Sequence, residues 1–184
     1  MTATTSKQLL DPLLVLTQAE VGEGDTVADF GCGPVGHFIF PASRIVGAEG
    51  GVYAIDIQKS VLTSVESRVR LDNLHNVTVL WGDIERASGV RVDDQFFDAV
   101  LIVNNLFMAK KTASLAEEAR RTLRFEGRLV VVDWNTLDSP IGPATKDRVS
   151  ATQAEALFVE HGFSLDHAFT PGPYHWGLVF RRRS

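Results

Sequence analysis

The sequence has little cysteine and no long hydrophobic run. Its only cysteine is Cys32, which excludes an intramolecular disulfide and a metal site built from several thiolates. The apolar runs are too short to cross a bilayer, and the run at 97–103 is followed directly by Asn104 and Asn105. Residues 1–7 are polar and lack the features of a secretory signal. We therefore expect a cytoplasmic protein with no membrane partner.

The sequence also lacks an excess of positive charge. It has 18 Lys and Arg against 23 Asp and Glu, for a net charge of −5, so a broadly basic nucleic-acid surface is not indicated. Hydrophobic residues make up 45% and charged residues 22% of the 184 positions, which is ordinary globular usage. A chain of this length buries about 70% of its surface on folding, so we expect one domain over 1–184.

Short apolar runs alternate with longer amphipathic stretches along the chain. Continuous runs rich in β-branched residues are typical of strands that are buried on both faces. We predict such strands at 27–30, 51–56, 77–83, 97–103 and 127–133. Helical spacing of apolar residues predicts helices over 7–19, 60–74, 112–123 and, from a capping-box pattern at Ser150, over 150–161.

Two further runs near the end of the chain, 163–169 and 174–181, are also strand-like. The four residues between them are too few for a parallel crossover, so we predict an antiparallel hairpin at one edge of the sheet. Arg181, Arg182 and Arg183 are interpreted as a solvated tail that keeps the last strand's edge soluble.

Polar residues stand where the first five predicted strands end. They are Asp29, Asp56, Asp83, Asn104 and Asp133. Ligands of open α/β sheets bind beyond the carboxyl ends of the strands, and a carboxylate beside a buried run is costly unless it has a partner. A single acid of this kind can simply cap the next helix, but the repetition at five strand ends favours a ligand site.

A glycine loop, Gly31 to Gly36, follows the first predicted strand. Its G-x-G-x-x-G spacing is a weak signal for a dinucleotide site, and Asp56 follows Gly36 by 20 residues, which suits an acid that binds a ribose. Asp29 stands where dinucleotide folds keep an apolar residue, Gly82-Asp83 adds an acid after the third strand, and the hairpin is foreign to a dinucleotide half-fold.

These residues together resemble the class I S-adenosylmethionine-dependent methyltransferases, over about 25–181. The resemblance implies a Rossmann-like, doubly wound α/β fold. Its seven-stranded sheet is mostly parallel with an antiparallel C-terminal hairpin strand, and helices cover both faces. It also implies a cofactor-binding core at 25–181 behind an N-terminal helical extension at 1–24.

The resemblance also assigns the cofactor-binding residues. The loop with Asp29, Gly31, Cys32 and Gly33 would hold the methionine part of S-adenosylmethionine, and Asp56 would bind the ribose hydroxyls. The adenine end falls to Gly82 and Asp83, between Ile57 and Ile84, while Asn104 would face the methyl group. The sequence departs from the family pattern because Pro34 and Val35 precede Gly36. Either the loop carries an insertion, or Gly36 is a helix residue.

Methyl transfer from a sulfonium is an in-line displacement, so the protein contributes mainly alignment and electrostatics. We take Asn105, Asp133 and His37 as catalytic candidates. Their plainer alternatives are a loop or helix-capping Asn, a carboxylate bonded to the backbone, and a half-exposed helix His. Metal-assisted relatives place an Asp at the end of strand 4, where this chain has Asn104, so we predict no metal.

We predict a transferase that methylates a small molecule, as a homo-oligomer or with a partner subunit. Residues 44–56 are similar to fibrillarin-like, isoaspartyl and tRNA methyladenosine methyltransferases, while 126–130 is similar to small-molecule enzymes of the ubiquinone-biosynthesis type. The alternatives are therefore methylation of RNA or protein with a partner subunit, a non-catalytic S-adenosylmethionine-binding module, and a nicotinamide-dependent oxidoreductase. A core of about 25–181 leaves few residues for substrate recognition, which favours a small acceptor or a partner.

Overall fold

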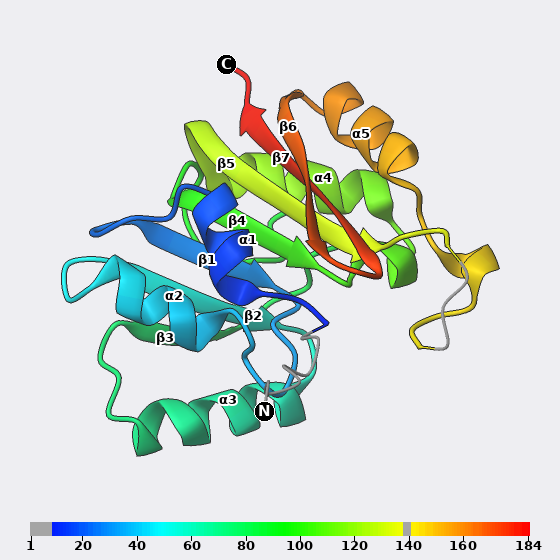
Figure 1. The fold of residues 1–184 in the computed structure, drawn as a ribbon. Helices are drawn as coiled ribbons and strands as arrows, with labels where there is room; N and C mark the ends of the chain where they lie inside the picture. Colours follow the sequence, from blue (N-terminus) through cyan, green and yellow to red (C-terminus); the bar gives the residue numbers. More distant parts are fainter. Residues whose placement is uncertain (1–8, 138–140) are drawn as a thin grey trace, which may run out of the picture.

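The computed structural model describes residues 9–137 and 141–184 as one seven-stranded sheet with helices on both faces (Figure 1). The strand order is β3-β2-β1-β4-β5-β7-β6. Strands β1 to β5 pair in parallel, and β7 runs antiparallel to both β5 and β6. The strands are β1 Thr26–Phe30, β2 Gly51–Asp56, β3 Val77–Trp81, β4 Phe97–Val103, β5 Leu123–Trp134, β6 Phe163–Gly172 and β7 His175–Arg182. The predicted Rossmann-like fold with its C-terminal hairpin is confirmed.

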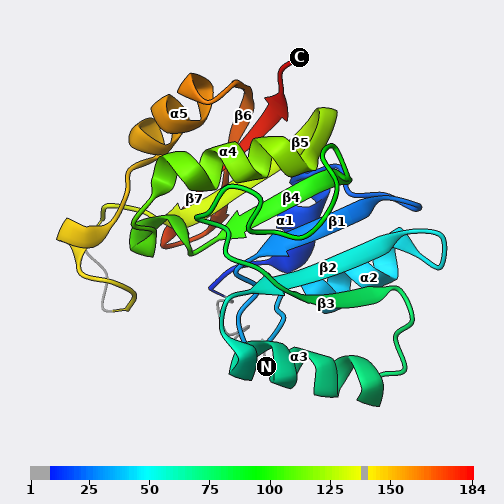
Figure 2. The ribbon, with the colours of Figure 1, turned by 180° about the vertical axis from the view of Figure 1, so that it is seen from behind.

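The helices cover both faces of this sheet. One apolar cluster joins the sheet to α1, α2 and α3, and a second joins the opposite face to α4 and α5 (Figures 1 and 2). Their bounds are α1 Pro12–Gln18, α2 Ile39–Val46, α3 Lys59–Leu71, α4 Thr112–Thr122 and α5 Ala151–Glu160, with short 3₁₀ helices at Leu106–Met108 and Thr145–Asp147. Within the two described ranges, no helix is both long and apolar enough to cross a membrane.

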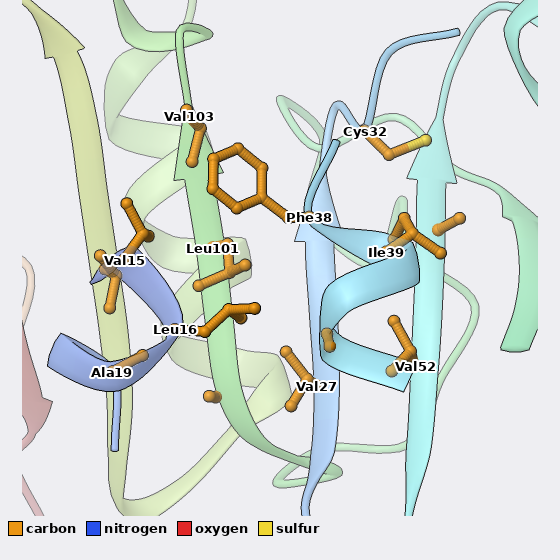
Figure 3. Packing of buried hydrophobic residues seen from close by; sticks show 14 of the residues in the cluster. Val15, Leu16, Ala19, Val27, Cys32, Phe38, Ile39, Val52, Leu101 and Val103 are labelled. Atoms are coloured by element: carbon orange, nitrogen blue, oxygen red, sulfur yellow. The ribbon is translucent and has the colours of Figure 1, made fainter. Parts of the chain in front are cut away.

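The central strands are largely apolar because both of their faces are covered. Every residue of β4 except Asp98 is buried, and β1 is buried from Val27 to Phe30. Phe38, which precedes α2, packs beside Val103 at the end of β4 (Figure 3). This packing fixes the chain leaving β1 against the chain leaving β4, and the candidate site lies between them.

Several helix bounds differ from the predictions. Helix α1 begins only at Pro12, where the Asp11 side chain accepts hydrogen bonds from the backbone of Leu13 and Leu14, while predicted residues 7 and 8 lie outside the described part. Leu123 was predicted as the end of a helix but is the first residue of β5, where it pairs with Phe97. A helix was expected after the glycine loop but without bounds, and the structure places it at α2, Ile39–Val46, where apolar residues face the sheet.

The prediction of a solvated C-terminal tail was wrong for Arg181 and Arg182. The second hairpin strand lies inside the sheet, between β5 and β6, so its last residues are held in place. Arg181 forms an ion pair with Glu20 at 2.5 Å, and Arg182 is only 8% exposed with its guanidinium over the Phe125 ring. The edge strand is β6 instead.

Candidate active site

Two adjoining cavities lie where the chain leaves β1, β2 and β4. Their volumes are about 620 and about 210 Å³. Both are lined by the same five residues, Gly31, Asp56, Gln58, Asn105 and Met108, so they form one continuous groove. Strands β1 and β4 are neighbours and their following segments diverge, which is the switch point where open α/β sheets bind ligands.

The glycine loop forms the wall between the two cavities. Gly31 and Gly33 have φ values of 76° and 65°, which residues other than Gly rarely adopt. The backbone N–H groups of Gly31 and Cys32 both donate to the Ile55 carbonyl, at 2.8 and 3.1 Å, and so tie the loop to β2. A Cβ on Gly31 would collide with the Asn105 carboxamide.

Gly36 is separate from this wall. It also has a positive φ, 59°, but it lines neither cavity, and a Cβ on it would lie 2.9 Å from the Phe40 ring. It therefore serves the turn that leads into α2 at Ile39. Gly36 is therefore not a helix residue, which was one of the two explanations for its spacing. It lies before α2 and away from the groove.

Asp29 carries a buried carboxylate at the inner end of the larger cavity. It is 2% exposed, and its Oδ2 atom has no hydrogen-bond partner among the described residues. Burial, with a smaller contribution from the charge of Asp56, raises the pKa of Asp29 to about 7. An unpartnered buried carboxylate that borders a cavity is a place for a cationic ligand group.

Cys32 also lines the larger cavity, yet its thiol is not activated as a nucleophile. Burial, then the charges of Asp29 and Asp56, raise the pKa of the Cys32 thiol far above its usual range. The thiol therefore stays protonated, which excludes a thiolate nucleophile here.

Asp56 ends β2 and borders both cavities. Its carboxylate accepts hydrogen bonds from the backbone N–H of Gln58 at 2.9 Å and of Gly33 at 3.4 Å. The smaller cavity continues from Asp56 to Ile57, Gly82, Asp83 and Ile84, all of which line it. The structure thus brings together every predicted residue of the adenine and ribose ends.

The two asparagines that follow β4 have different surroundings. Asn104 has a left-handed backbone, φ 55°, and its buried Oδ1 has no partner in the described part of the chain. The Asn105 Nδ2 lies within hydrogen-bond distance of three carbonyl oxygens, those of Phe30 at 3.0 Å, Gly31 at 3.1 Å and Val103 at 2.8 Å. Asn104 therefore has a free group to offer a ligand, and Asn105 joins the ends of β1 and β4.

The other two catalytic candidates, His37 and Asp133, differ in whether they reach the groove. His37 is exposed and lines the larger cavity. Asp133 is fully buried, lines neither cavity, and accepts hydrogen bonds from the backbone of Phe107 at 3.1 Å and Trp134 at 2.7 Å. Burial raises the pKa of Asp133 to about 6. Asp133 thus supports the turn after β4, which matches its plainer interpretation as a carboxylate bonded to the backbone.

Apolar residues that the sequence did not single out complete the larger cavity. Leu9, Leu10, Phe38, Val61 and Met108 line it. No motif marks them, because they come from four separate segments that only the fold brings together. Among the described residues, no group of three or more His, Cys, Asp or Glu side chains is arranged to hold a metal ion.

Residues 22–166 match the family model described as a methyltransferase domain. The chain belongs to this family. The match confirms the resemblance to the class I S-adenosylmethionine-dependent methyltransferases, with S-adenosylmethionine as the expected cofactor, and it replaces the nicotinamide-dependent alternative.

The chain is similar to curated methyltransferases of quinone biosynthesis. It is 33% identical over 129 residues to the ubiquinone/menaquinone biosynthesis C-methyltransferase of Chromobacterium violaceum, which is 70% of this chain and 50% of that one. It is 29% identical over 120 residues to the demethylmenaquinone methyltransferase of Listeria welshimeri, which is 65% of this chain and 49% of that one. The chain therefore spans about half the length of these relatives.

A solved structure covers more of the chain. The crystal structure of an S-adenosylmethionine-dependent methyltransferase from Aquifex aeolicus superposes with a TM-score of 0.87 at 25% identity. The superposition covers 95% of this chain and 90% of that one, which is more of the chain than the family model matches.

Proposed function

We propose that this chain is an S-adenosylmethionine-dependent methyltransferase that acts on a small, largely apolar acceptor. The observation that carries the proposal is the continuous groove, which is lined by glycines, strand-end acids and apolar side chains. Its larger part, about 620 Å³, is within the range of small-molecule sites.

The residues of the groove suit S-adenosylmethionine on three counts. Asp29 offers a buried carboxylate without a partner to a cationic group, and Gly33, with open space where a Cβ would stand, leaves the backbone open to close approach. Asp56 stands between the two cavities, where a ribose would join an adenine between Ile57 and Ile84 to the methionine part. Cys32, Gly82, Asp83 and Asn104 complete this set. When bound, the cofactor supplies a methyl group on a positively charged sulfur.

The chain's own residues would position the acceptor and handle its proton. Asn105 fixes the wall between β1 and β4, so that the groove is formed before ligands bind. Asp133 holds the turn at 106–108 from behind. His37 is the one imidazole among the residues that line the groove, and we assign it the proton that an acceptor would release.

The apolar lining suggests the class of acceptor. Leu9, Leu10, Phe38, Val103 and Met108 offer a compartment for a flat hydrophobic ring rather than for a charged polymer. Relatives in two bacteria are named as C-methyltransferases of ubiquinone and menaquinone biosynthesis or as a demethylmenaquinone methyltransferase. We therefore propose a reduced quinone-type ring, methylated at carbon.

Calorimetric titration tests the cofactor half of this proposal. We expect saturable binding of S-adenosylmethionine and of its demethylated product, with micromolar affinity. Asp56→Asn should weaken binding roughly tenfold to a hundredfold, because a charged hydrogen-bond acceptor is worth about 1.5–3 kcal/mol. The matched control Asp93→Asn removes an exposed acid outside the groove and should bind normally. Equal affinity in all three proteins would place the cofactor elsewhere.

A transfer assay tests the acceptor half. With methyl-labelled cofactor, reduced quinones should take up label, and His37→Gln should lower kcat while cofactor affinity stays unchanged. Cofactor binding without transfer to any acceptor would favour a non-catalytic binding module. Transfer to RNA, with salt-dependent RNA binding, would favour the polymer alternative and refute the quinone proposal.

A further inference from the structure

A second cavity of about 520 Å³ lies at the opposite end of β4 from the groove. It is built from the segment that enters β4 at Asp94 and Gln95, the end of α4, the turn between α5 and β6, and the end of β7. Because β4 leads from this cavity to the groove, the two sites are separated by the length of the strand. None of the residues that line one lines the other.

Arg120 is the first of two arginines in this cavity that form no ion pair with a described residue. Its side chain forms no hydrogen bond or ion pair with any residue in the described ranges, and its Nε atom is buried. It packs against the turn between α5 and β6, where a Cβ on Gly162 would lie 2.5 Å from that Nε. The guanidinium thus packs against this turn and lines the cavity, without a hydrogen-bond partner among the described residues.

Arg182 is the second. It is 8% exposed, and its guanidinium is stacked on Phe125 at 4.6 Å and donates one hydrogen bond to the Leu123 carbonyl. Its Nε is buried and has no partner within the described part. Burial, and then the positive charge of Arg120, lower the pKa of Arg182, and the negative charge of Asp94 offsets part of this shift. The two guanidiniums therefore act on each other as like charges.

The third arginine of the cavity is already neutralised. Arg121 pairs with buried Glu118 at 2.9 Å and with Asp94 at 2.7 Å, and it donates to the carbonyls of Val90 and Val92. The remaining acids that line the cavity, Glu117 and Glu160, are exposed and form no ion pair with Arg120 or Arg182 among the described residues. Two cations with free donors are therefore left facing the cavity.

We propose that this cavity is a binding site for a phosphate group, held between Arg120 and Arg182. Two guanidiniums present several N–H donors in fixed planes, which suits the oxygens of a phosphate. A doubly charged anion would also remove the like-charge repulsion that the empty site contains. The volume leaves room for a small phosphate monoester as well as for free phosphate.

Calorimetry in a phosphate-free, low-salt buffer tests this site, with inorganic phosphate and glycerol 3-phosphate as probes and chloride as the ionic-strength control. We expect saturable one-to-one binding and a higher melting temperature with phosphate. Arg120→Gln should weaken binding roughly tenfold or more without loss of melting temperature, because Arg120 has no bond to lose. Glu160→Gln should tighten binding, since it removes a negative charge from the lining.

The matched control is Arg91→Gln, which removes the same charge from an exposed position outside the cavity and should leave binding unchanged. Tighter binding of the monoester would identify an organic phosphate as the ligand, and equal or weaker binding would identify free phosphate. Absence of phosphate binding to the folded wild-type protein, or equal losses in Arg120→Gln and Arg91→Gln, would overturn the proposal.

Discussion

Asp29 shows how one residue links folding to ligand binding. Its position before the glycine loop marked it in the sequence as an acid in place of an apolar residue, and the structure buries it without a partner for Oδ2. The sequence cannot show this isolation, because it depends on Asp56 and on the cavity beside it. A site residue of this kind lowers the stability of the empty protein and becomes favourable only with a positively charged ligand.

The stability of the empty protein should therefore depend on the ionisation of Asp29. The folded pKa, about 7, is above the ordinary value of 3.8, so the folded state holds a proton that the unfolded state has lost. Stability should fall as pH rises from about 4 to 7, by a few kcal/mol at roughly 1.4 kcal/mol for each pKa unit. Asp29→Asn should melt like wild type near pH 4 and well above it at pH 8.

The exposed acid Asp93 supplies the control, since Asp93→Asn should not alter this pH profile. A difference between Asp29→Asn and wild type that is the same at pH 4 and pH 8 would show that Asp29 is not a buried, uncompensated acid.

Asn105 and Asn104 test the difference between positioning and ligand binding. Asn105→Ala removes the amide that joins three carbonyls of β1, its loop and β4, and should lower the free energy of unfolding by about 1–3 kcal/mol. Asn104→Gly keeps the left-handed backbone and removes an oxygen without a partner, so it should cost less stability but weaken cofactor binding. Thermal melts and calorimetry on both variants measure this. The reverse order of stability losses would contradict the assignment.

At the scale of elements, the sequence predicted where the strands lie better than it predicted which strands pair with one another. Continuous β-branched runs placed β1, β2 and β4 because these strands are covered on both faces. The sequence did not place β7 inside the sheet, since two strands joined by a short turn can add to an edge in either order. The order of β6 and β7 decides whether Arg182 is a surface residue or a buried one. The cavity with Arg120 and Arg182 was therefore not predicted.

The capping box of α5 is an element that both sequence and structure support. The Ser150 side chain accepts from the Gln153 backbone, and the Gln153 side chain accepts from the Ser150 N–H. Ser150→Ala should lower the free energy of unfolding by about 1 kcal/mol, measured by denaturant melts. Thr152→Ala, which changes an exposed residue inside the same helix, should be close to neutral. A loss no greater than that of Thr152→Ala would mean that the cap contributes nothing.

At the scale of the whole molecule, the groove and the cavity with Arg120 and Arg182 lie at opposite ends of β4. The groove was predicted from strand-end acids, because parallel strands bring their carboxyl ends to one edge. Its apolar compartment was not, because Leu9 and Leu10 reach it from before the first strand. Composition and length limit the class of acceptor, and only the folded structure shows which side chains line its cavity.

Cofactor binding should stabilise the whole molecule by mass action. At a concentration one hundred times the dissociation constant, S-adenosylmethionine should add about 2.7 kcal/mol to the free energy of unfolding. For a protein of this size, that corresponds to a rise in melting temperature of roughly 5–10 °C. Asp56→Asn should show a smaller rise at the same concentration, because its affinity is lower.

The most direct test of the central claim is titration of the folded protein with S-adenosylmethionine's demethylated product, beside the same titration with NADH. The groove between β1, β2 and β4 predicts one saturable site for the product, weakened in Asp56→Asn and unchanged in Asp93→Asn, and no binding of NADH. Absence of heat with the product in wild-type protein, or binding of NADH in its place, would contradict the account.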